Sequence, residues 1–341
     1  MKIIIFAILI LGFQSLKSQA ISGTVFDIGT GEEIEGASVY FGNTSIGTIT
    51  DGEGYFSIDS KFNSNTNLVI SHIGYLTVTI PYQKIGENIR IGMKEEFFEI
   101  PEVVLVADPF SRQQKLEVFR LEFLGESKGG INSEILNEDA LDLYFDVKTN
   151  TLFAHSSEPI ELINNYLGYQ IKFDLIDFQV AFKQKSLKRI DNIYKTIIYG
   201  HALFTDIVAK EERFANRRNR AYLGSIQHFI RTIWNGSWLD ESFGFSHELK
   251  KIDVSEAFKV SIGNNLFTKN VSFKLKKFKI SYKKGIFKYW SSIDLLSGNT
   301  ITVDKYGNYT PYLQLKFGGA MSNDRIGDLL PLDFELVEVV N

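Results

Sequence analysis

The sequence contains no cysteine in its 341 residues, which excludes disulfides and a lipid anchor on an N-terminal cysteine. Stability must therefore come from packed cores. Long apolar runs are also missing beyond the first residues, since no later segment reaches the ~20 apolar residues that a membrane-spanning helix needs. We therefore predict no transmembrane segment after removal of the N-terminus.

Motifs that would assign a reaction are also missing. The sequence has no Gly-x-Ser-x-Gly nucleophile turn, no glycine-rich phosphate loop and no His-Glu-x-x-His. The formal net charge of −4 is also opposite in sign to what nucleic-acid binding requires. We predict a protein that is not an enzyme, needs no cofactor or metal, and does not bind nucleic acid.

The N-terminus has the three parts of a secretory signal. Lys2 is followed by an apolar run over residues 3–13, and small residues stand at Ser18 and Ala20. We predict a signal peptide over residues 1–20. The mature chain would then lie in the periplasm or on the periplasmic face of an outer membrane, with secretion left open.

Aromatic residues are abundant, with 28 Phe and 15 Tyr, and these favour pleated, half-buried surfaces. The first part of the chain alternates apolar and polar residues between glycine turns, around Thr50-Asp51-Gly52-Glu53-Gly54-Tyr55-Phe56. We predict seven strands over residues 21–28, 37–41, 46–50, 55–59, 67–73, 75–80 and 88–93. They would form a β-sandwich whose core includes Val39, Phe56, Ile58, Val69 and Val78.

Four segments of this region carry a family resemblance: Gly23-Thr24-Val25, Gly36-Ala37-Ser38-Val39, the block at 50–56, and Ser71-His72-Ile73-Gly74-Tyr75. They resemble the carboxypeptidase regulatory-like domain, a transthyretin-like sandwich. The resemblance implies a non-catalytic module over residues 21–95.

The same module precedes the plug and barrel of TonB-dependent outer-membrane receptors, where a short strand like the one predicted at 102–106 follows it. The residues beyond 106 are too few for a barrel of ~22 strands.

Residues 96–128 are predicted to form a linker and a helix over 112–124, with Leu116, Phe119 and Phe123 on one face. Residues 129–341 are predicted to form a companion domain of α+β type, mostly antiparallel β. A phase change in the alternation near Ile176 and Asp177 predicts a bulge, and residues 271–282 show the same change. Glycine turns at 297–299 and 306–308 predict an antiparallel meander.

One long amphipathic helix is predicted over residues 207–234. Its spacing places Arg213, Arg217, Arg220 and Arg231 on one stripe, which we take as candidate binding residues. Such a stripe is either a solvated face with local ion pairs or a site for an anionic ligand or acidic partner. Residues 217–229, which include Gly224, resemble an uncharacterised companion region behind regulatory-like domains, and this resemblance implies no chemistry.

Two other sites remain as alternatives. His155-Ser156-Ser157-Glu158 has the His-x-x-Glu spacing of a zinc carboxypeptidase, although a strand-end histidine beside a turn explains it as well. Trp234, Trp238 and Trp290 could stack on sugars or seal a core. The lysines of 274–284 alternate with apolar residues, as on the solvated face of a strand.

The sequence therefore predicts a non-enzymatic, exported envelope protein that binds or scaffolds. Recognition would occur either by strand addition at an exposed sheet edge that involves residues 102–106 or through an acidic partner on the arginine stripe. Its partner would be an envelope protein or an anionic ligand, in a complex at the outer membrane. The alternative is a glycan-binding accessory protein for nutrient uptake at that membrane, and a third hypothesis is the zinc carboxypeptidase.

Overall fold

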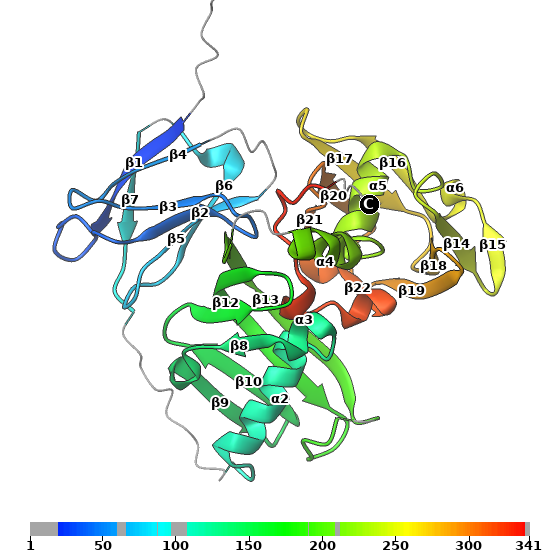
Figure 1. Ribbon diagram of the computed structural model, residues 1–341, viewed down its shortest axis with the longest axis horizontal. Helices are drawn as coiled ribbons and strands as arrows, with labels where there is room; N and C mark the ends of the chain where they lie inside the picture. The colour runs from blue at the N-terminus through cyan, green and yellow to red at the C-terminus, as the bar shows by residue number, and fades with distance from the viewer. Residues whose placement is uncertain are drawn as a thin grey trace, which may run out of the picture.

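The computed structural model describes residues 20–59, 66–86, 88–96, 108–189, 191–208 and 212–337. Within these residues the chain is mainly β, as predicted, and its sheets form three groups, each around its own hydrophobic cluster (Figure 1). The predicted signal peptide, apart from Ala20, and the predicted strand at 102–106 lie outside the described residues.

The first group is the predicted sandwich, and all seven predicted strands are present. They are β1 (Ala20–Asp27), β2 (Ser38–Phe41), β3 (Gly47–Ile49), β4 (Tyr55–Asp59), β5 (Asn67–Ser71), β6 (Val78–Pro81) and β7 (Ile89–Met93), with the short helix η1 (Tyr82–Lys84). One sheet has the order β4-β1-β7 and the other β3-β2-β5-β6. Strand β1 runs antiparallel to β4 and parallel to β7.

The core of the sandwich follows the predicted alternation with one exception. Three predicted core residues are buried there: Val39, Phe56 and Ile58. Val78 packs against them. Val69 was wrongly assigned to this core, because β5 turns Leu68 and Ile70 inward and therefore places Val69 on the opposite face of the sheet. Val69 is buried on that face, which the second group covers.

The turn before β4 is held by hydrogen bonds between the Asp51 side chain and the backbone that follows it. The Asp51 carboxylate accepts hydrogen bonds from the backbone N–H groups of Glu53, at 3.0 Å, and Tyr55, at 2.9 Å. Gly54 has φ +65°, which a glycine adopts without strain. These contacts agree with a structural turn.

The second group combines a six-stranded sheet with a helix. Its elements are α2 (Arg112–Leu124), α3 (Lys128–Ile131), η2 (Glu138–Ala140), β8 (Ser133–Ile135), β9 (Leu141–Asp146), β10 (Thr151–Ser156), β11 (Ile160–Asn164), β12 (Tyr169–Phe182) and β13 (Ile193–Asp206). Helix α2 has the predicted bounds and begins at a capping box of Ser111 and Gln114. Its residues Phe119 and Phe123 are fully buried in the core of this group.

The predicted bulge in β12 is confirmed, since the pairing of β12 with β13 shifts register between Leu175 and Asp177. The prediction of a similar bulge within one strand over residues 271–282 is wrong. The chain instead leaves one strand after Phe273 and begins another at Lys277, and the two strands belong to different sheets.

The third group contains two sheets and the remaining helices. Its elements are α4 (Glu212–Tyr222), α5 (Ile226–Asn235), β14 (Phe243–His247), β15 (Lys250–Ile252), α6 (Val254–Ala257), β16 (Phe258–Ile262), β17 (Thr268–Phe273), β18 (Lys277–Lys284), β19 (Phe287–Leu295), β20 (Thr300–Asp304), β21 (Tyr309–Thr310), η3 (Tyr312–Gln314), β22 (Leu315–Gly319) and η4 (Ala320–Asn323). The last short helix, η5 (Ile326–Asp328), packs against α2 and α3 of the second group. The sheet orders are β15-β14-β18-β19-β22 and β16-β17-β20-β21.

The predicted meander is correct in part. The turn at 306–308 joins the paired strands β20 and β21, whereas the turn at 297–299 carries the chain from β19 into the other sheet. The exposed lysines of β18 alternate with buried Phe278, Ile280 and Tyr282, as predicted for a solvated strand face.

The single helix predicted at 207–234 is wrong. Strand β13 continues to Asp206, and two helices follow, α4 and α5, which are separated at Gly224. Gly224 has φ +92°, and the Ser225 side chain then caps α5 by accepting from the backbone N–H of His228 at 3.1 Å. A Cβ on Gly224 would lie 2.7 Å from the Tyr282 ring, so the close neighbour is a side chain and not another backbone.

Residues 321–334 connect the three groups, and Figure 1 shows this red segment in the middle of the molecule. Met321 belongs to the core of the third group, Ile326 and Leu330 to that of the second, and Leu332 to that of the sandwich. The predicted division into domains at residues 95 and 128 stays a prediction.

The loop after β2 fixes the sandwich to β13 through backbone contacts. Asn43 N–H donates to the carbonyl of Ala202 at 2.7 Å, and Phe204 N–H donates to the carbonyl of Thr44 at 3.0 Å. Leu332 N–H donates to the carbonyl of Asn43 at 2.7 Å. One loop of the sandwich is therefore bound to both the second group and the C-terminal segment.

Candidate functional site

The four arginines predicted to form one stripe do not share one environment. Arg217 donates to the carbonyl of Tyr166 at 3.1 Å and lies 4.7 Å above the Tyr166 ring. Arg213 lies 4.7 Å from the ring of its neighbour Phe214. Because the helix breaks at Gly224, residues on either side of the break no longer continue one stripe.

Arg231 has a structural role in the C-terminal segment. Its guanidinium donates to the carbonyls of Tyr306 at 3.0 Å, Leu332 at 2.7 Å and Phe334 at 2.8 Å. A fork of N–H donors that is filled by backbone carbonyls is not open to a ligand. Arg231 is therefore excluded from the candidate site.

The sequence analysis missed Arg218, although it has the most contacts of the arginines on α4. It donates to the carbonyl of Leu167 at 2.8 Å and to the Asp206 carboxylate at 2.6 Å, and lies 3.7 Å above the Tyr169 ring. These contacts attach α4 to the end of β12. Helical periodicity could not identify Arg218, because its partners come from a distant strand.

Of the four predicted arginines, Arg220 lines a cleft of about 570 Å³. The cleft lies where the second and third groups meet. Its walls come from the end of α2, the junction of α4 and α5, the adjoining ends of β18 and β19, and η4 and η5. Lys284, Tyr282 and Tyr289 line it beside Arg220. This cleft is the candidate functional site.

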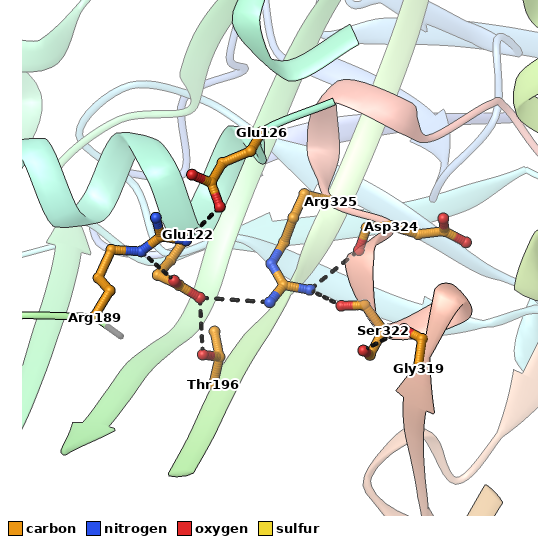
Figure 2. Close-up of polar contacts among 8 residues, drawn as sticks. All are labelled: Glu122, Glu126, Arg189, Thr196, Gly319, Ser322, Asp324 and Arg325. Carbon is orange, nitrogen blue, oxygen red and sulfur yellow. Dashed lines mark hydrogen bonds and ion pairs between the residues drawn. The ribbon is translucent and has the colours of Figure 1, made fainter. Parts of the chain in front are cut away.

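A buried ion network forms the base of one wall, and Figure 2 shows its members. Glu122 on α2 is 4% exposed and accepts from Arg189 at 2.8 Å, Thr196 at 3.0 Å and Arg325 at 3.4 Å. Exposed Glu126 accepts from Arg189 at 3.1 Å. The charge of Glu122 is therefore compensated by two arginines, as a buried carboxylate requires.

The same wall carries two acidic residues. Burial and the neighbouring charge of Asp328 raise the pKa of Asp324 to about 7, against the lowering effect of the Ile226 backbone N–H. Burial also raises the pKa of Asp328, while a hydrogen bond with Ser127 lowers it. The Asp324 carboxyl therefore keeps its proton to a higher pH than an exposed aspartate does.

The basic wall of the cleft is formed by Arg220 and Lys284. The Lys284 ammonium donates to the carbonyl of Arg220 at 3.3 Å, and burial together with the Arg220 charge lowers the pKa of Lys284. Among the described residues, no carboxylate lies within ion-pair distance of Arg220 or Lys284. Two neighbouring cations without an acidic partner favour an anionic group between them.

The residues of the other two hypotheses lie elsewhere. Glu158 accepts from the Asn137 side chain at 3.0 Å, while the Nε2 atom of His155 lies 3.8 Å from Glu96. Within the described ranges, no three His, Asp or Glu side chains gather as metal ligands. Trp234 and Trp238 pack against the core of the third group, and the Trp290 side chain is 48% exposed.

Comparison with known proteins bears on the first of the three groups. Residues 21–105 match the family model of the CarboxypepD_reg-like domain. The resemblance seen in the sequence is thus confirmed for this segment, which is a β-sandwich module and not a catalytic domain. The match ends before α2, so the cleft lies outside it.

No curated protein matches the chain. In the part of the chain that the structure describes, no helix has the length and apolar character needed to cross a membrane.

Proposed function

We propose that this chain is a non-enzymatic binding protein of the bacterial envelope, and that the cleft beside Arg220 receives an anionic group of an envelope protein. The regulatory-like sandwich is a rigid module in this proposal, and the companion region supplies the recognition surface. The predicted signal peptide supports an exported protein.

The observation that carries the proposal is the pair of Arg220 and Lys284 in the cleft, which has no carboxylate of the described residues within ion-pair distance. Glu122 is already satisfied by Arg189 and Arg325, so it is not free to neutralise the basic wall. A carboxylate or phosphate of a partner would relieve the repulsion between the two cations and accept hydrogen bonds from the Arg220 guanidinium.

The neighbouring residues suit a polypeptide ligand. Tyr282 and Tyr289 add aromatic surface to the basic wall, and Asp324 and Asp328 offer acceptors on the other. A partner segment with an acidic residue next to polar donors would match both walls. Small anions such as free phosphate would use only the basic wall.

The test compares Arg220→Glu with the wild-type chain. Each purified protein is immobilised and exposed to solubilised outer-membrane proteins, and the captured proteins are quantified. We expect Arg220→Glu to abolish capture, because it places a negative charge where the partner's anion would lie. The melting temperature should change only slightly, as it does for most substitutions of exposed residues.

The matched control is Arg213→Glu, on the same helix but outside the cleft. It makes the same change in net charge as Arg220→Glu. It should retain capture, because Arg213 does not line the cleft. Equal capture by wild type and Arg220→Glu would contradict the proposal. Equal loss in both variants would indicate a general charge effect and would also count against the cleft.

A further inference from the structure

The hairpin of β18 and β19 ends in two apolar side chains that are largely exposed. Ile286 is 91% exposed and Phe287 is 62% exposed at the turn, where Gly285 has φ +60°. Hydrophobic side chains at the end of a narrow hairpin are available for insertion into an apolar medium.

Lysines stand directly behind this apolar tip. Lys283 on β18 is paired in register with Lys288 on β19, and Lys284 is paired with Phe287. Like charges directly opposite each other on a sheet repel and destabilise the pair when nothing neutralises them. An anionic surface around the tip would remove this repulsion.

The next layer is aromatic and polar. Trp290 is half-exposed, and Lys288 Nζ lies 4.4 Å from the centre of its ring. Trp290 lines a hollow of about 760 Å³ on the outer face of the sheet, with Gly244 and Ser281 in the same cross-strand row.

Four lysines line this hollow: Lys251, Lys279, Lys283 and Lys288. No acidic residue is among the described residues that line it. The hollow therefore has a positive charge although the chain as a whole is acidic.

We propose that the β18–β19 hairpin docks this protein on an anionic lipid bilayer. Ile286 and Phe287 enter the outer edge of the hydrocarbon, Lys283 and Lys288 contact lipid phosphates, and Trp290 lies at the interface with water. The proposal is independent of the cleft and needs no partner protein.

The order of residues along the hairpin favours a bilayer over a protein partner. From the tip inward the side chains are apolar and then cationic, which is the order of hydrocarbon and phosphate in a bilayer. Trp290, beside Lys288, suits the headgroup level, where tryptophan is enriched. A protein partner would require a broader apolar patch than two residues at a turn. The lysines around the hollow provide charge complementarity to anionic headgroups.

The test measures co-sedimentation of the purified full chain with vesicles of phosphatidylcholine, with and without phosphatidylglycerol. We expect binding only when phosphatidylglycerol is present, and weaker binding as salt is raised. The double variant Ile286→Ser/Phe287→Ser should bind at least tenfold more weakly, since it removes the inserted apolar groups. Lys283→Gln and Lys288→Gln should each lower binding about fivefold.

The matched control is Leu266→Ser, since Leu266 is 89% exposed at another hairpin and stands between Asn265 and Phe267 without an adjacent lysine. It should bind as the wild type does. Absence of vesicle binding by the wild type would overturn the proposal, as would equal losses for Leu266→Ser and the tip variant. Capture of an acidic protein through Lys283 and Lys288, without vesicle binding, would assign the hairpin to a protein interface instead.

Discussion

Tyr40 of the sandwich donates a hydrogen bond to Asp174 of β12, although 134 residues separate the two in the chain. Asp174 is buried and also accepts from Ser71 at 2.5 Å and Thr77 at 3.2 Å. Three hydroxyl groups of the sandwich thus converge on one carboxylate of the companion region. This buried contact fixes the module on the sheet beside it.

We predict that Asp174→Ala lowers the free energy of unfolding by about 2–4 kcal/mol, because it leaves buried hydroxyl groups without an acceptor. Tyr40→Phe should cost about 1.5–3 kcal/mol, the value of a hydrogen bond to a charged group. Urea unfolding measures both changes. Tyr144→Phe is the control, since Tyr144 is 55% exposed, and a cost as large as that of Tyr40→Phe would contradict the assignment.

The sandwich was predictable because its signals are local. Alternation and glycine turns lie within a few residues of each of its strands. In β12 of the second group, the phase slip at Ile176 and Asp177 likewise marks the observed bulge. The same kind of slip between Phe273 and Lys277 marks a change of sheet instead. A short-range pattern cannot distinguish these two outcomes, because both interrupt the alternation in the same way.

The cleft was not predictable in the same way. Glu122 and Arg325 lie 203 residues apart, so no local spacing could place them together. The helix break did have a local signal, since Gly224 followed by Ser225 is a helix end followed by an N-cap. Because the helix ends at Gly224, the helical spacing of the arginines on α4 does not extend to Arg231.

Glu122 offers a second prediction, because it joins α2 to Arg189 and to Arg325 (Figure 2). Glu122→Gln keeps the shape of the side chain but leaves two partly buried arginines without their carboxylate. We expect a loss of about 3–5 kcal/mol in unfolding free energy. Thermal unfolding of the purified variant would measure it.

Glu126→Gln is the matched control for this network. Its side chain is 65% exposed and pairs with the same Arg189, so its loss should cost less than about 1 kcal/mol. Similar costs for the two variants would show that the network at Glu122 is not the stabilising element inferred here.

Asp324 makes stability depend on pH. Because its pKa is raised from 3.8 to about 7 in the folded chain, the folded state keeps a proton that the unfolded state has released between these two values. The contribution of Asp324 to unfolding free energy therefore falls as pH rises from about 4 to 7. Asp324→Asn should remove this slope and be more stable than the wild type at pH 8, by about 1–2 kcal/mol after allowance for solvent screening.

Unfolding free energies of wild type and Asp324→Asn at several pH values test whether Asp324 lowers stability as pH rises. Asp253→Asn is the control, since hydrogen bonds with Ser255 lower the pKa of Asp253 and place its effect below pH 4. Its difference from the wild type should stay constant between pH 4 and 7. A constant difference for Asp324→Asn as well would contradict the raised pKa.

Gly224 allows a direct test of the helix break beside the cleft. Gly224→Ala places a Cβ 2.7 Å from the Tyr282 ring on a residue with φ +92°, so both backbone strain and a clash oppose it. We expect a loss of about 2–3 kcal/mol. Gly236→Ala is the matched control, since Gly236 has φ +75° but nothing within 4 Å of the added Cβ, and it should cost only about 1 kcal/mol. Equal melting temperatures for the two alanine variants would show that contact with Tyr282 does not require glycine at position 224.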